Sequence, residues 1–148
     1  MQLTEHFTYE EMTYSETAIR KNYNNTPDNT ARNNLVVLCS HLLEPLRSIF
    51  NVPIKINSGY RSLQVNAAVG GVDTSQHTKG QAADTVAIGL SVKNYYQRIK
   101  ELVRTGQISV DQCIYEYNSW VHLSYNEGHN RNQFLIKEYG KPYVRDES

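Results

Sequence analysis

Two histidines and one aspartate are the residues with the clearest potential for chemistry: His77, Asp84 and His122. His77 lies in a polar, turn-like segment, and Asp84 stands seven residues later, where small residues lead into an apolar run. An aspartate that opens a buried strand is costly unless it is paired or bound to a metal. His122 lies between Val121 and Leu123. Three protein ligands with a fourth position open to water form the arrangement of a catalytic zinc site.

The spacing between His77 and Asp84 sets a condition on the local fold. On one helix the two residues would stand about 10 Å apart, whereas two ligands of one zinc ion lie within roughly 4 Å of each other. The segment must therefore fold back as a loop followed by a strand, and Gly80 supplies the flexibility for this reversal. Taken alone, the pair is equally compatible with a metal site and with a surface loop. Likewise, a histidine among apolar strand residues is by default a core or edge residue.

Hydrophobic periodicity and capping residues predict the helices that would support such a site. Apolar residues recur at three- and four-residue steps over residues 35–49, which predicts the longest helix. Pro45 should kink or tighten the end of this helix. Ahead of it, Thr8 and Ser15 each predict the start of a short helix. Two further helices are expected at residues 62–69 and 91–106.

Runs of alternating or β-branched residues predict the strands. They are expected at residues 53–57, 82–88, 113–117, 120–125 and 134–136. Because helices come mostly first and strands mostly later, an α+β fold is favoured over a doubly wound sheet. We expect a single domain over residues 1–148, with N-terminal helices packed on a small, mainly antiparallel sheet that carries the metal site.

Length and composition exclude several classes of protein. The 148 residues supply one core, and the 15 basic and 15 acidic side chains give no net charge. A general nucleic-acid or membrane-surface binder needs a basic face, so neither is expected. No stretch approaches the ~20 consecutive apolar residues of a membrane span, and the first residues lack the pattern of a secretory signal. Cys39 and Cys113 fit no metal or redox motif and are expected to be buried and reduced.

These motifs together resemble the M15 family of zinc peptidases. The resemblance rests on the pattern Ser75-x-His77-(x)6-Asp84, the later Trp-Val-His that ends at His122, and two upstream motifs. The upstream motifs are Ser-Gly-Tyr-Arg-Ser at residues 58–62 and Asn-x-x-Val-Gly-Gly at residues 66–71. The family contains D-alanyl-D-alanine carboxypeptidases and phage and bacterial peptidoglycan endopeptidases, and the similarity runs from about Phe7 to Tyr125.

The resemblance implies roles for individual residues. His77, Asp84 and His122 would be the zinc ligands. Arg61 would contact the substrate, and its guanidinium is suited to bidentate binding of a carboxylate. Ser75 would hydrogen-bond the substrate or brace the ligand loop.

The general base is the point at which the sequence departs from many family members. They carry Asp or Glu three residues before the second zinc histidine, where this chain has Ser119. The nearest upstream carboxylate is Glu116. If the two strands met in a two-residue hairpin at residues 118–119, Tyr115 would oppose His122 and Glu116 would point to the other face. A longer loop or a bulge would bring Glu116 round to the histidine.

We expect Glu116 to be the base, with Asp73 and Glu127 as lesser candidates, and His129 to lie in an exposed loop. Among the aromatic residues, Tyr60, Trp120 and Tyr125 flank the expected site residues and could form the walls of a cleft.

The resulting functional hypothesis is zinc-dependent hydrolysis of peptide bonds in peptidoglycan stem peptides, by a monomer that uses Zn²⁺ and binds no nucleic acid. Whether it acts as a D-Ala-D-Ala carboxypeptidase or as an endopeptidase is left open. One alternative is a non-catalytic cell-wall- or phage-particle-binding domain whose metal is structural or absent; another is a metal-dependent hydrolase of an unrelated substrate. Made in the cytoplasm without a signal peptide, the protein would reach the wall after holin-type release or as part of a phage particle.

Overall fold

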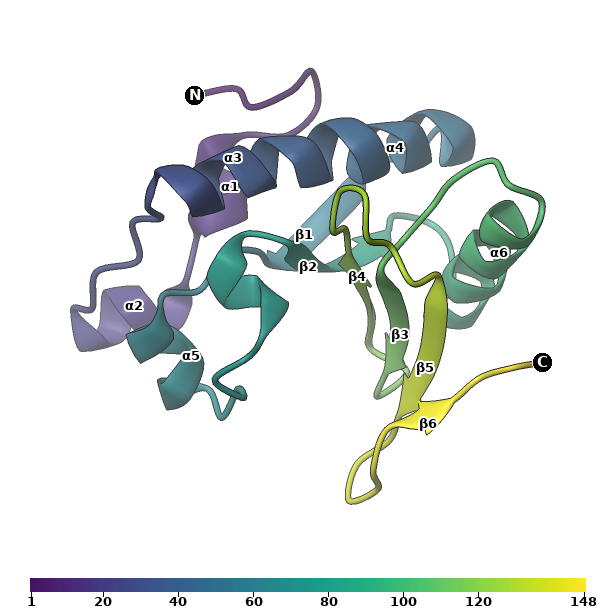
Figure 1. The fold of residues 1–148 in the computed structure, drawn as a ribbon. Helices are drawn as coiled ribbons and strands as arrows, with labels where there is room; N and C mark the ends of the chain where they lie inside the picture. The colour runs from purple at the N-terminus through teal and green to yellow at the C-terminus, as the bar shows by residue number, and fades with distance from the viewer.

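A six-stranded sheet forms the centre of the structure, and its strands follow the order β1-β2-β4-β3-β5-β6 (Figure 1). The computed structural model describes residues 1–148. The strands are β1 (Ile54–Ser58), β2 (Ala82–Ala87), β3 (Gln112–Glu116), β4 (Trp120–Ser124), β5 (Gln133–Lys137) and β6 (Val144–Arg145). The helices are α1 (Tyr9–Thr13), α2 (Glu16–Lys21), α3 (Asn29–Leu38), α4 (Glu44–Phe50), α5 (Leu63–Ala68) and α6 (Val92–Arg104), with a π-helical turn at Cys39–Leu43 and a 3₁₀ turn at Gln76–Lys79.

The strand pairings confirm the predicted α+β class and the mainly antiparallel sheet. All neighbouring strands run antiparallel except β3 and β5, which are parallel. The predicted strands and helices all appear, most with ends shifted by one or two residues. The helix predicted over residues 35–49 begins earlier, at Asn29, because the mostly polar residues 29–34 show no apolar periodicity although they form its first turns. The sequence did not predict the 3₁₀ turn or β6, since a two-residue strand at the edge of a sheet leaves almost no periodic signal.

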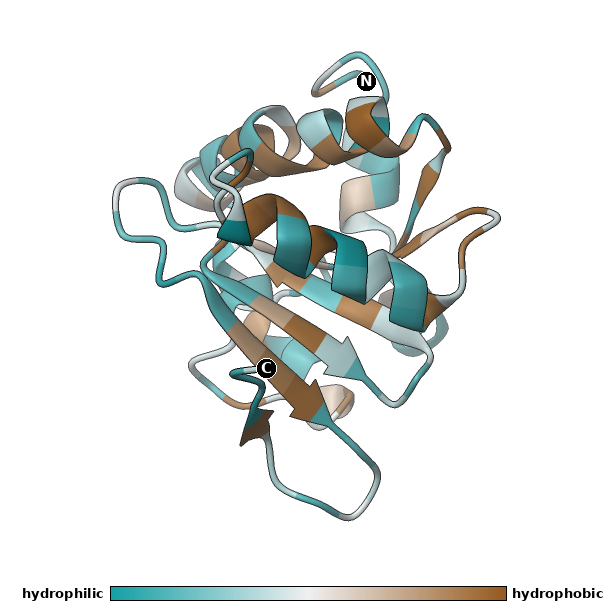
Figure 2. Cartoon of the chain, turned by 90° about the vertical axis from the view of Figure 1, so that its right-hand side faces the viewer, coloured by the Kyte–Doolittle hydropathy of each residue, from teal (hydrophilic) through white to brown (hydrophobic).

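The two faces of the sheet have opposite characters because successive strand residues point to opposite sides. On one face, residues such as Ala83, Val121 and Leu123 are fully buried and belong to the hydrophobic core. The leucines of α3 and α4 and the apolar residues of α6 pack in this same core. Figure 2, in which α6 lies in front of the sheet, shows hydrophilic residues on the outward side of that helix. The other face is left free for a site.

The long helix is distorted ahead of Pro45, although the distortion widens a turn in its middle and does not kink or tighten its end as expected. The distortion is the π-helical turn at Cys39–Leu43, which lies between α3 and α4 and ends just before Pro45. Proline lacks an N–H, and its ring clashes with the carbonyl four residues earlier, so a wider turn accommodates it. Despite this turn, Leu42 and Leu46 are completely buried, so the apolar stripe remains continuous.

The C-terminal residues are fastened to α6. Asp146 accepts hydrogen bonds from the Tyr96 hydroxyl at 2.8 Å and from the Lys100 ammonium at 3.0 Å. These contacts join the segment after β6 to the helix α6, while β5 itself pairs with β3 in the sheet. Cys39 and Cys113 are buried and unbonded, as predicted. No helix of the protein has the length and apolar character that crossing a membrane requires.

Candidate metal centre and cleft

Strand pairing brings Asp84 and His122 together. Asp84 on β2 lies directly opposite His122 on β4 in the antiparallel register. Both side chains therefore leave the sheet on the face away from the hydrophobic core. The Asp84 Oδ1 atom lies 3.2 Å from His122 Nδ1, and both side chains are almost entirely buried.

His77 reaches the same point by the reversal that the sequence predicted. The 3₁₀ turn Gln76–Lys79 carries it, and the Ser75 hydroxyl caps the turn by accepting a hydrogen bond from the His77 N–H at 3.2 Å. Gly80 ends the turn with a φ of 73°, and β2 begins two residues later. A Cβ at Gly80 would lie 2.2 Å from the carbonyl oxygen of Ala31, so this position also requires the close approach that only glycine permits.

A loop from the sequence motif at residues 58–62 orients the His77 ring. The Gly59 carbonyl oxygen lies 2.7 Å from His77 Nδ1, and the Arg61 N–H donates to the His77 carbonyl at 3.0 Å. Because a carbonyl only accepts, the proton of the neutral ring lies on Nδ1. The lone pair is therefore on Nε2, and this atom faces Asp84 Oδ1 at 3.3 Å.

The electrostatics of this cluster favour a cation. Burial opposes ionisation of Asp84, but the two imidazoles outweigh it and lower the pKa of this carboxyl well below its usual value. The candidate ligand atoms of His77, Asp84 and His122 all lie within 4.8 Å of one another. The distances from Asp84 Oδ1 to His122 Nδ1 (3.2 Å) and to His77 Nε2 (3.3 Å) match the ~3.4 Å expected between ligands at 2.0–2.1 Å from a tetrahedral zinc ion. Two nitrogens and one carboxylate oxygen therefore fit a zinc ion.

The hairpin between β3 and β4 decides where Glu116 points. Its connection is Tyr117–Ser119, one residue longer than the two-residue hairpin, and Glu116 pairs with Trp120. In this register Ile114 opposes His122, so Glu116 lies on the same face as the histidine. The longer loop thus gives the outcome in which the carboxylate is brought round. Tyr117 and Asn118 adopt positive φ values of 56° and 51° to make the turn.

Glu116 is a buried carboxylate beside the candidate ligands. Its Oε1 atom lies 3.7 Å from His122 Nδ1 and accepts a hydrogen bond from Trp120 Nε1 at 3.3 Å. Burial and the neighbouring Asp84 charge raise the pKa of Glu116, and His122, Trp120 and Arg61 only partly oppose them. A buried carboxyl with a raised pKa is typical of a group that exchanges protons in catalysis.

The lesser candidates for a base lie elsewhere. Asp73 and Glu127 are exposed, and the Glu127 carboxylate lies 3.6 Å from the imidazole of His41. His129 is in an exposed loop, as expected. Asp73, Glu127, His129 and His41 all lie outside the cleft that opens over the candidate ligands.

A cleft of about 930 Å³ opens over the candidate ligands. Its lining includes Arg61, Ser75, Glu116 and Trp120, together with the three ligand candidates. Burial lowers the pKa of Arg61 below its usual value, although Asp84 and Glu116 partly oppose this, and the Arg61 Nε atom is buried without a hydrogen-bond partner. A cationic donor group is therefore available to a ligand inside the cleft.

Of the three aromatic residues expected to form the walls of the cleft, only one does so. Trp120 lines the cleft, but Tyr60 is buried outside it and Tyr125 packs against His41. Tyr117 and Tyr143 line it instead. Tyr143 comes from the turn before β6, and nothing in the sequence pattern placed it near the other residues.

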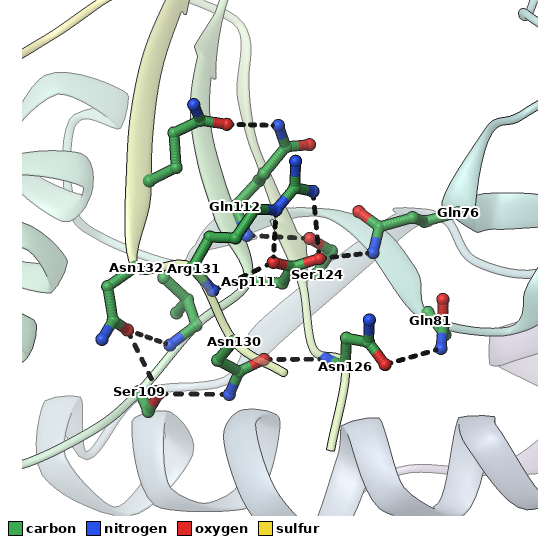
Figure 3. Close-up of polar contacts among 12 residues, drawn as sticks. Gln76, Gln81, Ser109, Asp111, Gln112, Ser124, Asn126, Asn130, Arg131 and Asn132 are labelled. Carbon is green, nitrogen blue, oxygen red and sulfur yellow. Dashed lines mark hydrogen bonds and ion pairs between the residues drawn. The ribbon is translucent and has the colours of Figure 1, made fainter. Parts of the chain in front are cut away.

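Two polar residues that the sequence did not single out hold the ligand segments. Asn25 donates to the carbonyls of Thr13 and Tyr60 and accepts from the N–H of Ser62, which fixes the loop that carries Arg61. On the other side, Gln76 donates to the buried carboxylate of Asp111 at 2.8 Å (Figure 3). Because Gln76 immediately precedes His77, this bond holds the 3₁₀ turn against the end of β3.

A His-Asp-His cluster in a cleft, with a buried glutamate beside it, has the elements of a metal-dependent hydrolase site. The family model described as Peptidase M15 matches residues 5–124. The chain therefore belongs to the peptidase M15 family, a family of metallopeptidases. No curated protein matches the sequence.

Proposed function

We propose that this protein hydrolyses peptide bonds in peptidoglycan stem peptides with the help of one zinc ion. The observation that carries the proposal is the position of Glu116, 3.7 Å from His122 in the cleft that contains the His-Asp-His cluster. Family membership supports peptidase chemistry. The buried glutamate supplies the proton acceptor that Ser119 cannot supply.

Three side chains would hold the zinc ion: His77 through Nε2, Asp84 through Oδ1 and His122 through Nδ1. When bound, zinc supplies the positive charge that acidifies a water molecule and polarises a substrate carbonyl. Glu116 accepts the proton that the attacking water loses and donates it to the nitrogen of the leaving amine. Arg61 pairs with a substrate carboxylate and so fixes the peptide in the cleft.

Digestion of purified muropeptides tests the proposal. The zinc-loaded protein is expected to release products that mass spectrometry identifies. Free D-alanine indicates a carboxypeptidase, and split cross-links indicate an endopeptidase. His77→Ala should abolish product formation, whereas His129→Ala, which changes an exposed histidine outside the cleft, should leave it unchanged.

Two outcomes would contradict the proposal. Full activity of His77→Ala would exclude the assigned metal cluster from the reaction. Binding of the protein to cell walls without any released peptide would favour a non-catalytic wall-binding domain instead.

A further inference from the structure

Two arginines, Arg61 and Arg131, line the cleft. The row of cleft-facing residues on β3 runs from Gln112 through Ile114 to Glu116, and His122 on β4 lies opposite Ile114. Arg61 lies beside the candidate ligands, since its backbone N–H donates to the His77 carbonyl and its charge interacts with those of Asp84 and Glu116. The second arginine that lines the cleft is Arg131, which is bonded to Asp111, the residue just before β3.

The Arg131 guanidinium is held in place with donors to spare. Its Nε donates to Asp111 Oδ1 at 2.7 Å and one terminal nitrogen donates to Oδ2 at 3.1 Å. The other terminal nitrogen makes no hydrogen bond, and Figure 3 shows it pointing away from Asp111. The Asp111 side chain is only 2% exposed, whereas that of Arg131 is 55% exposed. One edge of the guanidinium is therefore anchored and the other edge is accessible from the cleft.

The surrounding hydrogen bonds make this edge rigid (Figure 3). Asp111 is held from the opposite side by Gln76. Within the loop that carries Arg131, Asn130 donates to the Ser109 hydroxyl, and Asn132 accepts from both Ser109 and the Val110 N–H. A guanidinium already fixed in this way loses little further conformational freedom when it binds a ligand, which favours binding.

The chemistry of the free edge selects a carboxylate. Arginine presents parallel N–H donors that match the two oxygens of a carboxylate or the oxygens of a phosphate. The cleft that leads to it holds a peptide in the proposed function, and the anions that a peptide carries are carboxylates. Beside the metal cluster the cleft is lined by apolar Ile114 and Leu135, which pair across β3 and β5 and suit short aliphatic side chains, and polar Gln112 lies between them and Asp111.

We propose that Arg131 binds a second carboxylate of the peptide substrate, distinct from the one that Arg61 holds beside the metal cluster. This inference rests on the proposed function and adds a substrate class to it. Asp111 precedes Ile114, the partner of His122, by three residue steps, about 10 Å at the rise of an extended chain. An extended substrate covers this distance with about three residues. The carboxylate therefore belongs to a residue about three positions from the scissile bond.

Matched peptides with and without that carboxylate test the inference. The free-acid peptide is compared with its side-chain amide for wild type, Arg131→Gln, Arg131→Lys and Arg104→Gln. Wild type should show a lower KM for the acid, by about ten- to a hundredfold. Arg131→Gln should lose this preference by raising KM for the acid alone, and Arg131→Lys should keep part of it. Arg104 is exposed on α6 outside the cleft, so its variant should behave as wild type.

A binding measurement separates this inference from the proposed function. Trp120 is the only tryptophan of the chain and lines the cleft, so its fluorescence reports peptide binding without catalysis. Titration of the metal-free protein with both peptides should show the same preference for the acid. If the metal-free protein prefers to bind the acid but the zinc-loaded protein cleaves neither peptide, the proposed function is refuted and the carboxylate site is retained. Equal binding of both peptides by wild type, or an unchanged preference in folded Arg131→Gln, would overturn the inference.

Discussion

The Glu116→Gln variant is expected to lose most of its activity while its fold stays intact. Glu116 is 8% exposed, and its carboxylate accepts a hydrogen bond from the Trp120 indole. Glutamine has the same shape and keeps an acceptor oxygen, so only the negative charge and the capacity to accept a proton are lost. Removing a general base typically slows a reaction by about 10²- to 10⁴-fold, a rise in the activation barrier of about 3–5 kcal/mol.

The same substitution should stabilise the metal-free protein. Burial and the Asp84 charge raise the pKa of Glu116 in the folded chain, so its ionised form opposes folding at neutral pH. The ionised carboxylate lowers the free energy of unfolding by its full amount above the raised pKa of Glu116. This destabilisation disappears below the pKa of a glutamate in the unfolded chain, about 4.3. In the presence of a chelator, Glu116→Gln should therefore have a higher free energy of unfolding than wild type at pH 7. The difference should shrink as the pH falls to 4.

Two assays check this pair of effects: kcat on a stem peptide with zinc, and urea unfolding of the metal-free protein. Glu127→Gln is the matched control, because it changes an exposed carboxylate outside the cleft and should alter neither quantity. An active Glu116→Gln would refute its role as the base. A destabilised, metal-free Glu116→Gln would refute the argument that this carboxylate is buried at a cost.

Three further predictions concern the supports of the site. Gly59→Ala would place a Cβ 2.3 Å from the Met12 carbonyl oxygen and so displace the Gly59 carbonyl, which orients His77. Zinc affinity, measured in competition with a chromogenic chelator, should therefore fall about 10- to 100-fold. Unchanged affinity would contradict this role of Gly59. Zinc at a hundred times its dissociation constant should stabilise wild type by about 2.7 kcal/mol in thermal unfolding, and a similar gain in His77→Ala would place the ion elsewhere. Burial raises the pKa of Asp146, but its hydrogen-bond donors outweigh this and lower the pKa to about 2. The ionised carboxylate should therefore contribute up to about 2 kcal/mol above pH 4 that is lost as the pH falls through 2. Asp146→Asn should lack this dependence in acid unfolding, and parallel curves would refute the stabilisation of this carboxylate by Ser148, Tyr96 and Lys100.

The helices and strands could be predicted from the sequence because capping residues and hydrophobic spacing act over only a few neighbouring residues. Thr8 and Ser15 cap their helices as expected, since each hydroxyl accepts a hydrogen bond from an N–H three residues later. The spacing of leucines predicted which helix would enter the core. The strand order and the parallel pairing of β3 with β5 were not predicted, because they depend on contacts between residues far apart in the chain.

The candidate ligands could be predicted from residue type and spacing together with the resemblance to the M15 family, but the rest of the site only in part. The face on which Glu116 lies depends on the length of the Tyr117–Ser119 turn. That turn needs a positive φ at a tyrosine, an uncommon conformation that the sequence does not announce. Arg131 and Tyr143 come from the C-terminal part of the chain, beyond the matched family region, and only folding brings them to the cleft.

A zinc titration of the chelated protein tests the central claim most directly, with hydrolysis of a stem peptide as the readout. We expect no cleavage without metal, and a rate that rises with added zinc and reaches its plateau at one ion per chain. Cleavage by the fully chelated protein, or none at saturating zinc, would contradict the assignment of this cleft as a zinc peptidase site.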